Sequence, residues 1–232
     1  MTIEKTDVLV IGAGQAGIAA SEHLSNAGIN HLVLERDRIA EKWRSARWDS
    51  LVANGPAWHD RFPNMEFEAH PDAFVAKEGV ANYLKAYAEM LKAPIREGVT
   101  VTELRRNVGG EGFIADTSHG QIKARYVISA TGAFQRPTMP PIVPQTDGLT
   151  QMHSTDYRNP QDSPAGNVLV VGAGSSGVQI ATELMQSGRK TVLSVGSHHR
   201  PPRRYRGRDF CWWHDPCDFG RAWPRRAGCG KP

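Results

Sequence analysis

The stretch Val8-Leu9-Val10-Ile11-Gly12-Ala13-Gly14-Gln15-Ala16-Gly17 decides the fold of this chain. Its four apolar residues predict a buried parallel strand, and the residues from Gln15 onward have the spacing of a helix. In that context the first glycine permits a tight turn, the second lets the backbone approach a pyrophosphate, and the third lets the helix pack on the strand. The helix N-terminus then presents its amides to the phosphates. We therefore expect a dinucleotide to contact Gly12, Gly14, Gln15, Ala16 and Gly17.

The same pattern returns as Val168-Leu169-Val170-Val171-Gly172-Ala173-Gly174-Ser175-Ser176-Gly177. Both copies reach a helix-ending glycine at the same interval, Gly28 in the first and Gly188 in the second. Strand, helix and strand are predicted at 7–11, 15–27 and 31–35, and again at 168–171, 176–187 and 191–195. The second copy is expected to bind its nucleotide through Gly172, Gly174, Ser175, Ser176 and Gly177. Two dinucleotides in one chain favour electron transfer from a nicotinamide to a flavin.

The intervening sequence predicts a loop at 39–63, an amphipathic helix at 80–91 and short strands at 100–104, 112–115 and 121–124, then a buried strand at 126–130. The predicted fold class is therefore α/β, with two Rossmann-like dinucleotide-binding units and a small antiparallel β-meander. Four prolines between 137 and 144 predict a stiff crossover. The expected domains are 1–136 and an incomplete 150–213, joined by a crossover at 137–149 and followed by an irregular tail at 214–232.

The composition excludes several classes of protein. With 40% hydrophobic residues the chain is typical of a globular protein, and no run approaches the roughly 20 apolar residues of a membrane helix. A strand so near the start leaves no room for a signal peptide, so we expect a cytoplasmic protein with no membrane partner. The excess positive charge lies in residues 200–232, where a phosphate-binding loop and a solvated tail explain it better than a nucleic-acid surface. The three cysteines, at 211, 217 and 229, have neither C-x-x-C nor zinc-ligand spacing, which disfavours a dithiol reductase and a metal site.

The two copies differ after their second strand. Glu35 ends that strand in the first copy, where an acidic side chain accepts hydrogen bonds from an adenosine ribose. No acid stands at the corresponding point of the second copy, which continues to Ser197 and Arg200. A carboxylate would repel a 2′ phosphate, whereas serine and arginine can bind one. We therefore expect NADP(H) in the second copy, with Arg203, Arg204 and Arg206 as alternative phosphate ligands.

Several segments together resemble the flavin-containing monooxygenases and their bacterial flavoprotein relatives. The matching segments are the two glycine motifs, Glu35-Arg36, Glu41-Lys42-Trp43-Arg44, Trp48-Asp49-Ser50-Leu51, Ala130-Thr131-Gly132 and His153-Ser154-Thr155-Asp156-Tyr157-Arg158. The resemblance implies an enzyme that uses FAD, NADPH and dioxygen. It also implies that a flavin hydroperoxide oxygenates a small substrate with a nucleophilic nitrogen or sulfur.

The resemblance assigns roles to single residues of this sequence. Glu35 and Arg36 would lie on the adenosine side of FAD, Trp43 and Arg44 would line the flavin, and the Val101 backbone would meet the adenine. Thr131 and Gly132 would pass close to the cofactor. Asn54 falls near a family asparagine whose amide lies beside the flavin, which makes it the candidate catalytic residue. Because Gly55-Pro56 follows, a turn residue is the alternative for Asn54, and loop packing is the alternative for Trp43.

Relatives in that family continue beyond the equivalent of residue 213. We therefore expect the later part of the fold to be missing, with weakened FAD retention and a tendency to associate, for example as a homo-oligomer. Two other functions stay open: an FAD and NAD(P)H oxidoreductase that does not oxygenate, and a non-catalytic nucleotide-binding remnant.

Overall fold

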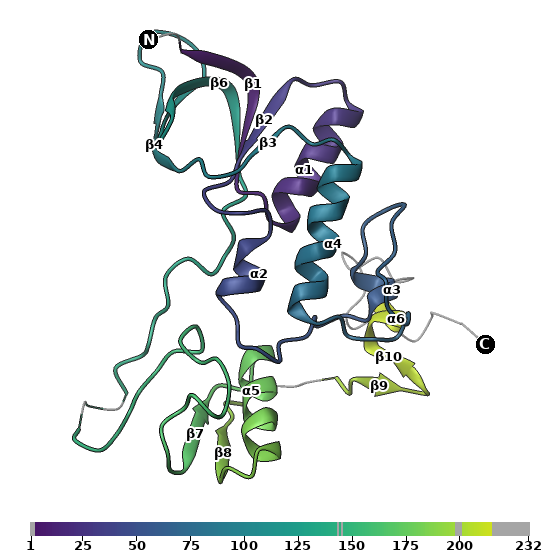
Figure 1. Ribbon diagram of the computed structural model, residues 1–232, viewed down its shortest axis with the longest axis vertical. Coiled ribbons are helices and arrows are strands. Elements are labelled where there is room, and N and C mark those ends of the chain that lie inside the picture. Colours follow the sequence, from purple (N-terminus) through teal and green to yellow (C-terminus); the bar gives the residue numbers. More distant parts are fainter. Residues whose placement is uncertain (1–2, 143, 145, 198–200, 215–232) are drawn as a thin grey trace. The chain divides into compact units, whose positions relative to one another are not determined.

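A mixed six-stranded sheet organises the first of two compact units, which contains Met1–Leu51 and Lys77–Pro164. The computed structural model describes residues 3–142, 144, 146–197 and 201–214. The strands follow the order β3-β2-β1-β6-β5-β4, and Figure 1 labels β1, β2, β3, β4 and β6 of this sheet. They are β1 (Glu4–Ile11), β2 (His31–Leu34), β3 (Ile95–Arg96), β4 (Val101–Arg106), β5 (Phe113–Thr117) and β6 (Gly120–Ser129). The first three strands and β6 run parallel, and β4, β5 and β6 form the predicted antiparallel meander.

Strand β6 joins the parallel and antiparallel parts of this sheet. It pairs with β1 from Ile122 to Ser129 and with β5 from Gly120 to Ala124. The prediction of two separate strands at 121–124 and 126–130 was therefore wrong. Arg125, which lies between the two predicted segments, is exposed on a continuous strand. Strand β1 pairs with Ala124 and with Tyr126, the two neighbours of Arg125, so the strand continues through this position.

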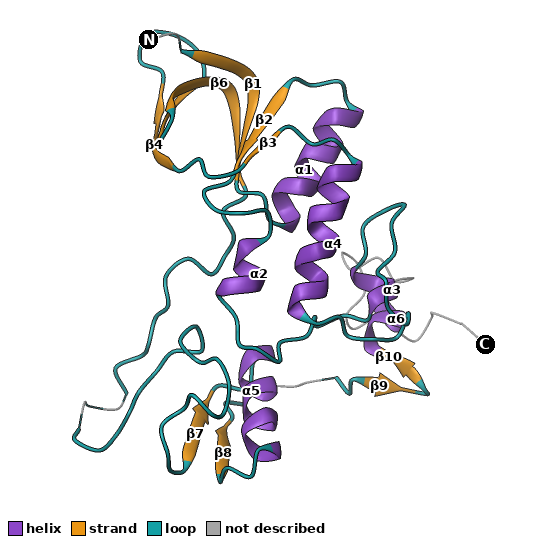
Figure 2. Cartoon of the chain, viewed as in Figure 1, coloured by secondary structure: helices purple, strands orange, loops and turns teal. Residues whose placement is uncertain are grey.

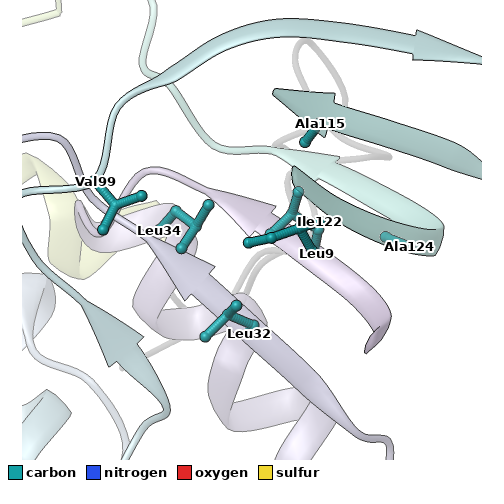
Figure 3. Packing of buried hydrophobic residues seen from close by; sticks show 7 residues of the cluster. All are labelled: Leu9, Leu32, Leu34, Val99, Ala115, Ile122 and Ala124. Atoms are coloured by element: carbon teal, nitrogen blue, oxygen red, sulfur yellow. The ribbon is translucent and has the colours of Figure 1, made fainter. Parts of the chain in front are cut away.

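One hydrophobic cluster lies beneath both parts of the sheet (Figure 3). Its members are Leu9, Leu32, Leu34, Val99, Ala115, Ile122 and Ala124. These side chains come from β1, β2, β5, β6 and the turn before β4, so the meander shares the core of the parallel strands. The shared burial fixes which face of each strand points inward.

Helices α1 (Gln15–Asn26) and α4 (Lys77–Met90) lie side by side in this unit (Figure 2). Tyr87 of α4 is fully buried and hydrogen-bonds to Glu22 of α1. Helix α1 ends at Asn26, and Gly28 follows its C-cap Ala27 with a φ of 68°, the left-handed conformation expected of a helix-stopping glycine. The expected loop at 39–63 instead contains two short helices, α2 (Glu41–Ser45) and α3 (Ala57–Asp60), because local turns there close into single helical turns.

The second compact unit contains Val52–Ala76 and Ala165–Pro232. Strands β7 (Val168–Val171) and β8 (Thr191–Ser194) are parallel, and α5 (Ser175–Gln186) packs on both. Strand β7 was expected to be buried, but Val168 and Val170 are only half-buried, and Leu169 and Val171 are each 59% exposed. An antiparallel pair, β9 (Arg204–Tyr205) and β10 (Arg208–Asp209), leads into α6 (Phe210–His214).

The two compact units are defined by the contacts between residues of the chain. The domain boundaries expected from the sequence stay a prediction. Segment 52–76 joins the second glycine motif, and residues 150–164 join the first. Among the described residues, no helix has both the length and the apolar character needed to span a bilayer.

Candidate nucleotide-binding sites

The turn between β1 and α1, residues 12–17, is a backbone cradle that we call the first cradle. Gly12 has a φ of 105°, and a Cβ there would lie 2.5 Å from the Ala130 carbonyl oxygen. A Cβ on Gly17 would lie 1.9 Å from the Gly12 carbonyl oxygen, because helix and turn touch at that point. Both glycines are therefore required by the packing of the chain on itself.

Gly14 differs from its two neighbours in the motif. Its φ of −83° and ψ of −171° are extended values that any residue adopts, and a Cβ there would meet nothing within 4 Å. Gly14 is the N-cap of α1 and provides no side-chain cap, and the helical hydrogen bonds begin with Ile18 N–H to Gly14 O. The amides of Gln15, Ala16 and Gly17 precede the first helical hydrogen bond and lie at the positive end of the helix dipole, and Gln15 and Ala16 are exposed there. This arrangement suits a phosphate that approaches the backbone closely.

Glu35 is joined to the first cradle by its carboxylate. Oε2 accepts a hydrogen bond from Ala13 N–H at 2.8 Å, and Oε1 accepts one from Asp37 N–H at 3.0 Å. A carboxylate has about four acceptor positions, so capacity remains for the hydroxyls of a ribose. The Glu35 carbonyl oxygen also accepts from Val99 N–H at 2.9 Å, which brings the start of β4, at Val101, to the same end of the sheet. Arg36 is exposed and pairs with Asp37.

Helix α2 begins beside the first cradle, because Ala40 N–H donates to Ala13 O at 3.1 Å. Trp43, on this helix, is half-buried. The Arg44 guanidinium donates to Asn82 Oδ1 at 2.8 Å and to Ile39 O at 3.3 Å, so it joins α2 to α4. Its predicted place beside a flavin stays a prediction, and in this structure its contacts are with the protein.

Trp48 was not singled out as a cofactor ligand by sequence reasoning. The side chain is 2% exposed, and its indole Nε1 finds no hydrogen-bond partner among the described residues. A buried donor without an acceptor costs about 1–3 kcal/mol, so such a group calls for an explanation. Trp48 lies three residues after α2 in the unit that holds the first cradle. No sequence signal identifies an unpaired donor, because pairing depends on the tertiary structure.

Arg47 and the segment that follows β6 also belong to the unit that contains the first cradle. Arg47 is half-buried, with its guanidinium carbon 5.1 Å from the centroid of the Phe134 ring, and burial lowers the pKa of Arg47. The predicted residues Thr131 and Gly132 follow β6 next to Ala130, which packs on Gly12. The Gln135 side-chain amide donates to the carbonyl oxygens of Thr131 and Gly132.

The turn between β7 and α5, residues 172–177, repeats this geometry and is called the second cradle. Gly172 has a φ of 101°, and a Cβ on Gly177 would lie 1.9 Å from the Gly172 carbonyl oxygen. Gly174 is extended, with φ −66° and ψ 177°, and a Cβ there would again meet nothing within 4 Å. Helical hydrogen bonding begins with Val178 N–H to Gly174 O, which leaves the amides of Ser175 and Ser176 in an open first turn.

The residues expected to select the second nucleotide are only partly visible. Ser197 is exposed after β8, whereas Arg200 lies outside the described residues. The candidate catalytic residue Asn54 belongs to the same compact unit as the second cradle. Its side-chain Oδ1 accepts a hydrogen bond from Gln179 of α5 at 3.4 Å.

The described residues do not offer a reactive thiol or a metal site. Cys211 is half-buried, and burial together with a hydrogen bond to Asp209 raises its pKa to about 11. A thiol with that pKa is almost entirely protonated at neutral pH and is a poor nucleophile. Within the described ranges, no cluster of three His, Cys, Asp or Glu side chains could hold a metal ion.

Three relatives illustrate what this chain is similar to. It is 39% identical over 210 residues to Uncharacterized oxidoreductase CzcO-like of Geobacillus kaustophilus, covering 89% of this chain and 59% of that protein. It is 29% identical to indole-3-pyruvate monooxygenase YUCCA1 of Oryza sativa subsp. japonica, covering 86% and 50% of the two chains. The structure matches a flavin-containing monooxygenase from Stenotrophomonas maltophilia with a TM-score of 0.74 and 28% identity, covering 90% and 62%. The chain thus spans between half and two thirds of the length of these relatives.

The family model described as pyridine nucleotide-disulphide oxidoreductase matches residues 9–206, which include both cradles. The α/β fold with two Rossmann-like units agrees with this match and with the structural neighbours. The chain therefore belongs to the pyridine nucleotide-disulphide oxidoreductase family.

Proposed function

We propose that this protein is an FAD-dependent monooxygenase that uses NADPH and dioxygen to oxygenate a small substrate with a nucleophilic nitrogen or sulfur. The single observation that carries the proposal is the pair Gly14 and Gly174. Neither the backbone conformation nor the packing requires glycine at these two positions. In both cradles the residue without a side chain therefore serves the close approach of a ligand to an open helix N-terminus.

The first cradle is assigned to FAD. Gly14 and the amides of Gln15, Ala16 and Gly17 would hold the pyrophosphate, and the Glu35 carboxylate would accept hydrogen bonds from the adenosine ribose. We assign the buried Trp48 N–H as a donor to the cofactor, which would supply the missing acceptor, and we assign Trp43 and Arg44 to the flavin side. When bound, FAD supplies a redox group that accepts a hydride and reduces dioxygen. The chain supplies the orientation of that group.

The second cradle is assigned to NADPH. It has the same phosphate-binding backbone as the first, but no carboxylate corresponds to Glu35 after β8. Ser197 and Arg200 are proposed as the ligands of the 2′ phosphate, which distinguishes NADPH from NADH. Asn54 is proposed to donate its side-chain amide to the oxygen that is transferred. Two of the similar proteins are named monooxygenases, one of them flavin-containing, which supports oxygenation over simple oxidation.

Within the described residues, Cys211 does not support a competing function suggested by the family description, the reduction of a disulfide. Reduction of a disulfide substrate needs a reactive thiolate near the flavin, and Cys211 is held protonated by burial and by Asp209. Oxygen chemistry needs no such thiol.

The test is spectroscopic. FAD is titrated into the purified chain, NADPH or NADH is added without oxygen, and air is then admitted with a sulfide or amine. The proposal expects FAD to bind, NADPH to bleach it faster than NADH, and oxygenated product to form. Hydrogen peroxide equal to the NADPH consumed, without product, would instead establish an oxidoreductase that does not oxygenate. Absence of FAD binding would refute the assignment of the first cradle.

A further inference from the structure

Gln179 makes an unusual set of contacts with the segment that contains Asn54. Its Oε1 accepts a hydrogen bond from Val52 N–H, and its Nε2 donates to Val52 O, both at 3.4 Å. The same Nε2 donates to Asn54 Oδ1, also at 3.4 Å. One side-chain amide therefore pairs with both backbone groups of Val52, as a neighbouring strand would, and also holds the Asn54 side chain.

The segment itself, residues 52–60, has its own backbone support. Val52 forms a β-bridge with Ala76, and Ala53 N–H donates to Val75 O at 2.8 Å. Gly55 N–H donates to the Asp60 carboxylate at 2.9 Å, which closes the turn after Asn54. These bonds hold the segment to residues 73–76, whereas Gln179 joins it to α5.

The position of Gln179 on α5 connects it with the second cradle. Ser175, whose amide opens the helix, lies four residues before Gln179 and so on the same helix face. Side chains on a helix also lean toward its N-terminus, which here is the end that faces the cradle. A phosphate that fixes the first turn of α5 thus fixes the residue that holds Val52 and Asn54.

We propose that Gln179 is a positioning residue that couples occupancy of the second cradle to the placement of Asn54. The inference rests on the proposed binding of NADP(H) at that cradle. Hydrogen bonds of 3.4 Å are long, and polar contacts in ligand-free sites commonly tighten when the ligand binds. Nucleotide binding would accordingly hold Asn54 in a fixed position. Its side-chain amide would then be in place to donate to the oxygen that is transferred.

Amide hydrogen exchange of the whole chain, with and without NADP⁺, tests this coupling. Gln179→Met keeps the length of the side chain and removes all three hydrogen bonds. Thr182→Ala is the matched control, because Thr182 is exposed on the same helix and bonds only locally, to Val178 O. The Ala53 amide serves as an internal control for folding, since its bond to Val75 O does not involve Gln179.

In the wild-type chain, NADP⁺ should slow exchange at Val52. In Gln179→Met, Val52 should exchange about fivefold faster without nucleotide, the effect of one lost hydrogen bond, and should no longer respond to NADP⁺. Gln179→Glu retains the acceptor for Val52 N–H and should restore slow exchange there. Linkage further requires NADP⁺ affinity in Gln179→Met to fall by the same factor as the wild-type slowing at Val52.

Two results would overturn the coupling and can be told apart. Wild-type binding of NADP⁺ with no change at Val52, or with an equal response in Gln179→Met, refutes the role of Gln179 alone. If the wild-type chain binds no NADP⁺ at all, the assignment of the second cradle fails and the coupling fails with it.

Discussion

Alanine substitutions at Gly14 and Gly17 should separate nucleotide binding from folding. At Gly14 the extended backbone accepts alanine and no atom lies within 4 Å of the new Cβ. Gly14→Ala should therefore change the free energy of unfolding by less than about 0.5 kcal/mol in the absence of FAD. At Gly17 the new Cβ would lie 1.9 Å from the Gly12 carbonyl oxygen, well inside the 3.0 Å limit of real contacts. Helix α1 must then move away from β1, so Gly17→Ala should cost about 1–3 kcal/mol.

Gly17→Ala should lose more stability than Gly14→Ala, whereas Gly14→Ala should lose more affinity for FAD than Gly17→Ala. The methyl group of Gly14→Ala occupies the space through which a phosphate reaches the backbone amides. We expect at least a tenfold loss of affinity, or about 1.4 kcal/mol. Urea unfolding without FAD and fluorescence titration with FAD measure the two quantities separately. A Gly14→Ala chain that binds FAD like the wild type would refute the cradle, and a fully stable Gly17→Ala chain would refute the packing argument. Gly174→Ala and Gly177→Ala, measured with NADP⁺, repeat the experiment in the second cradle.

Three further substitutions or measurements test other groups. Trp48→Phe should leave the unfolding free energy of the FAD-free chain nearly unchanged, because removal of an unpaired donor (about 1–3 kcal/mol) offsets the lost packing. The same variant should bind FAD about three- to tenfold more weakly, and unchanged affinity would exclude the indole N–H as a donor to the cofactor. Glu35→Gln should weaken FAD binding by roughly tenfold but leave FMN binding unchanged, because FMN has no adenosine ribose; an equal loss for both in calorimetry would contradict the ribose role. Alkylation of Cys211, followed by peptide mass spectrometry, should be slow at pH 8 and accelerate up to about pH 11. Since the folded pKa is raised, Cys211 should contribute stability below the pKa of an unfolded thiol, and that contribution should be lost as the pH rises toward 11.

The repeated strand–helix–strand units could be predicted from the sequence because their signals are local. The apolar run before Gly12 and the glycine at position 28 specify where the elements begin and end, and the structure follows them closely. The continuous β6 was missed because a short window of sequence does not show that one strand pairs with two partners, β5 up to Ala124 and β1 as far as Ser129. The half-exposed β7 was missed because an apolar run alone does not say how many of its faces are covered.

Parts of the candidate site could be predicted where the contacts lie within one strand–helix–strand motif. Glu35 lies where the motif places it and bonds to the Ala13 amide. The unpaired N–H of Trp48 could not be predicted, because the absence of a partner among the described residues depends on everything packed around the indole. Gln179 was missed for a similar reason, since its contacts with Val52 and Asn54 join segments more than 120 residues apart.

The two cradles have nearly the same backbone, so selectivity between two nucleotides must come from residues outside the cradles. Gly12 and Gly172 have similar φ values, and a Cβ added at Gly17 or at Gly177 would lie 1.9 Å from the carbonyl oxygen of Gly12 or Gly172. Both cradles present backbone amides at a helix N-terminus, so this shared backbone is not expected to select between the two proposed nucleotides. What differs is the side chain after the second strand, a carboxylate at Glu35 in the first copy and none in the second. A glutamate placed after β8 should accordingly shift the proposed preference of the second cradle from NADP(H) toward NAD(H), measured by titration with both nucleotides, while its affinity for pyrophosphate remains.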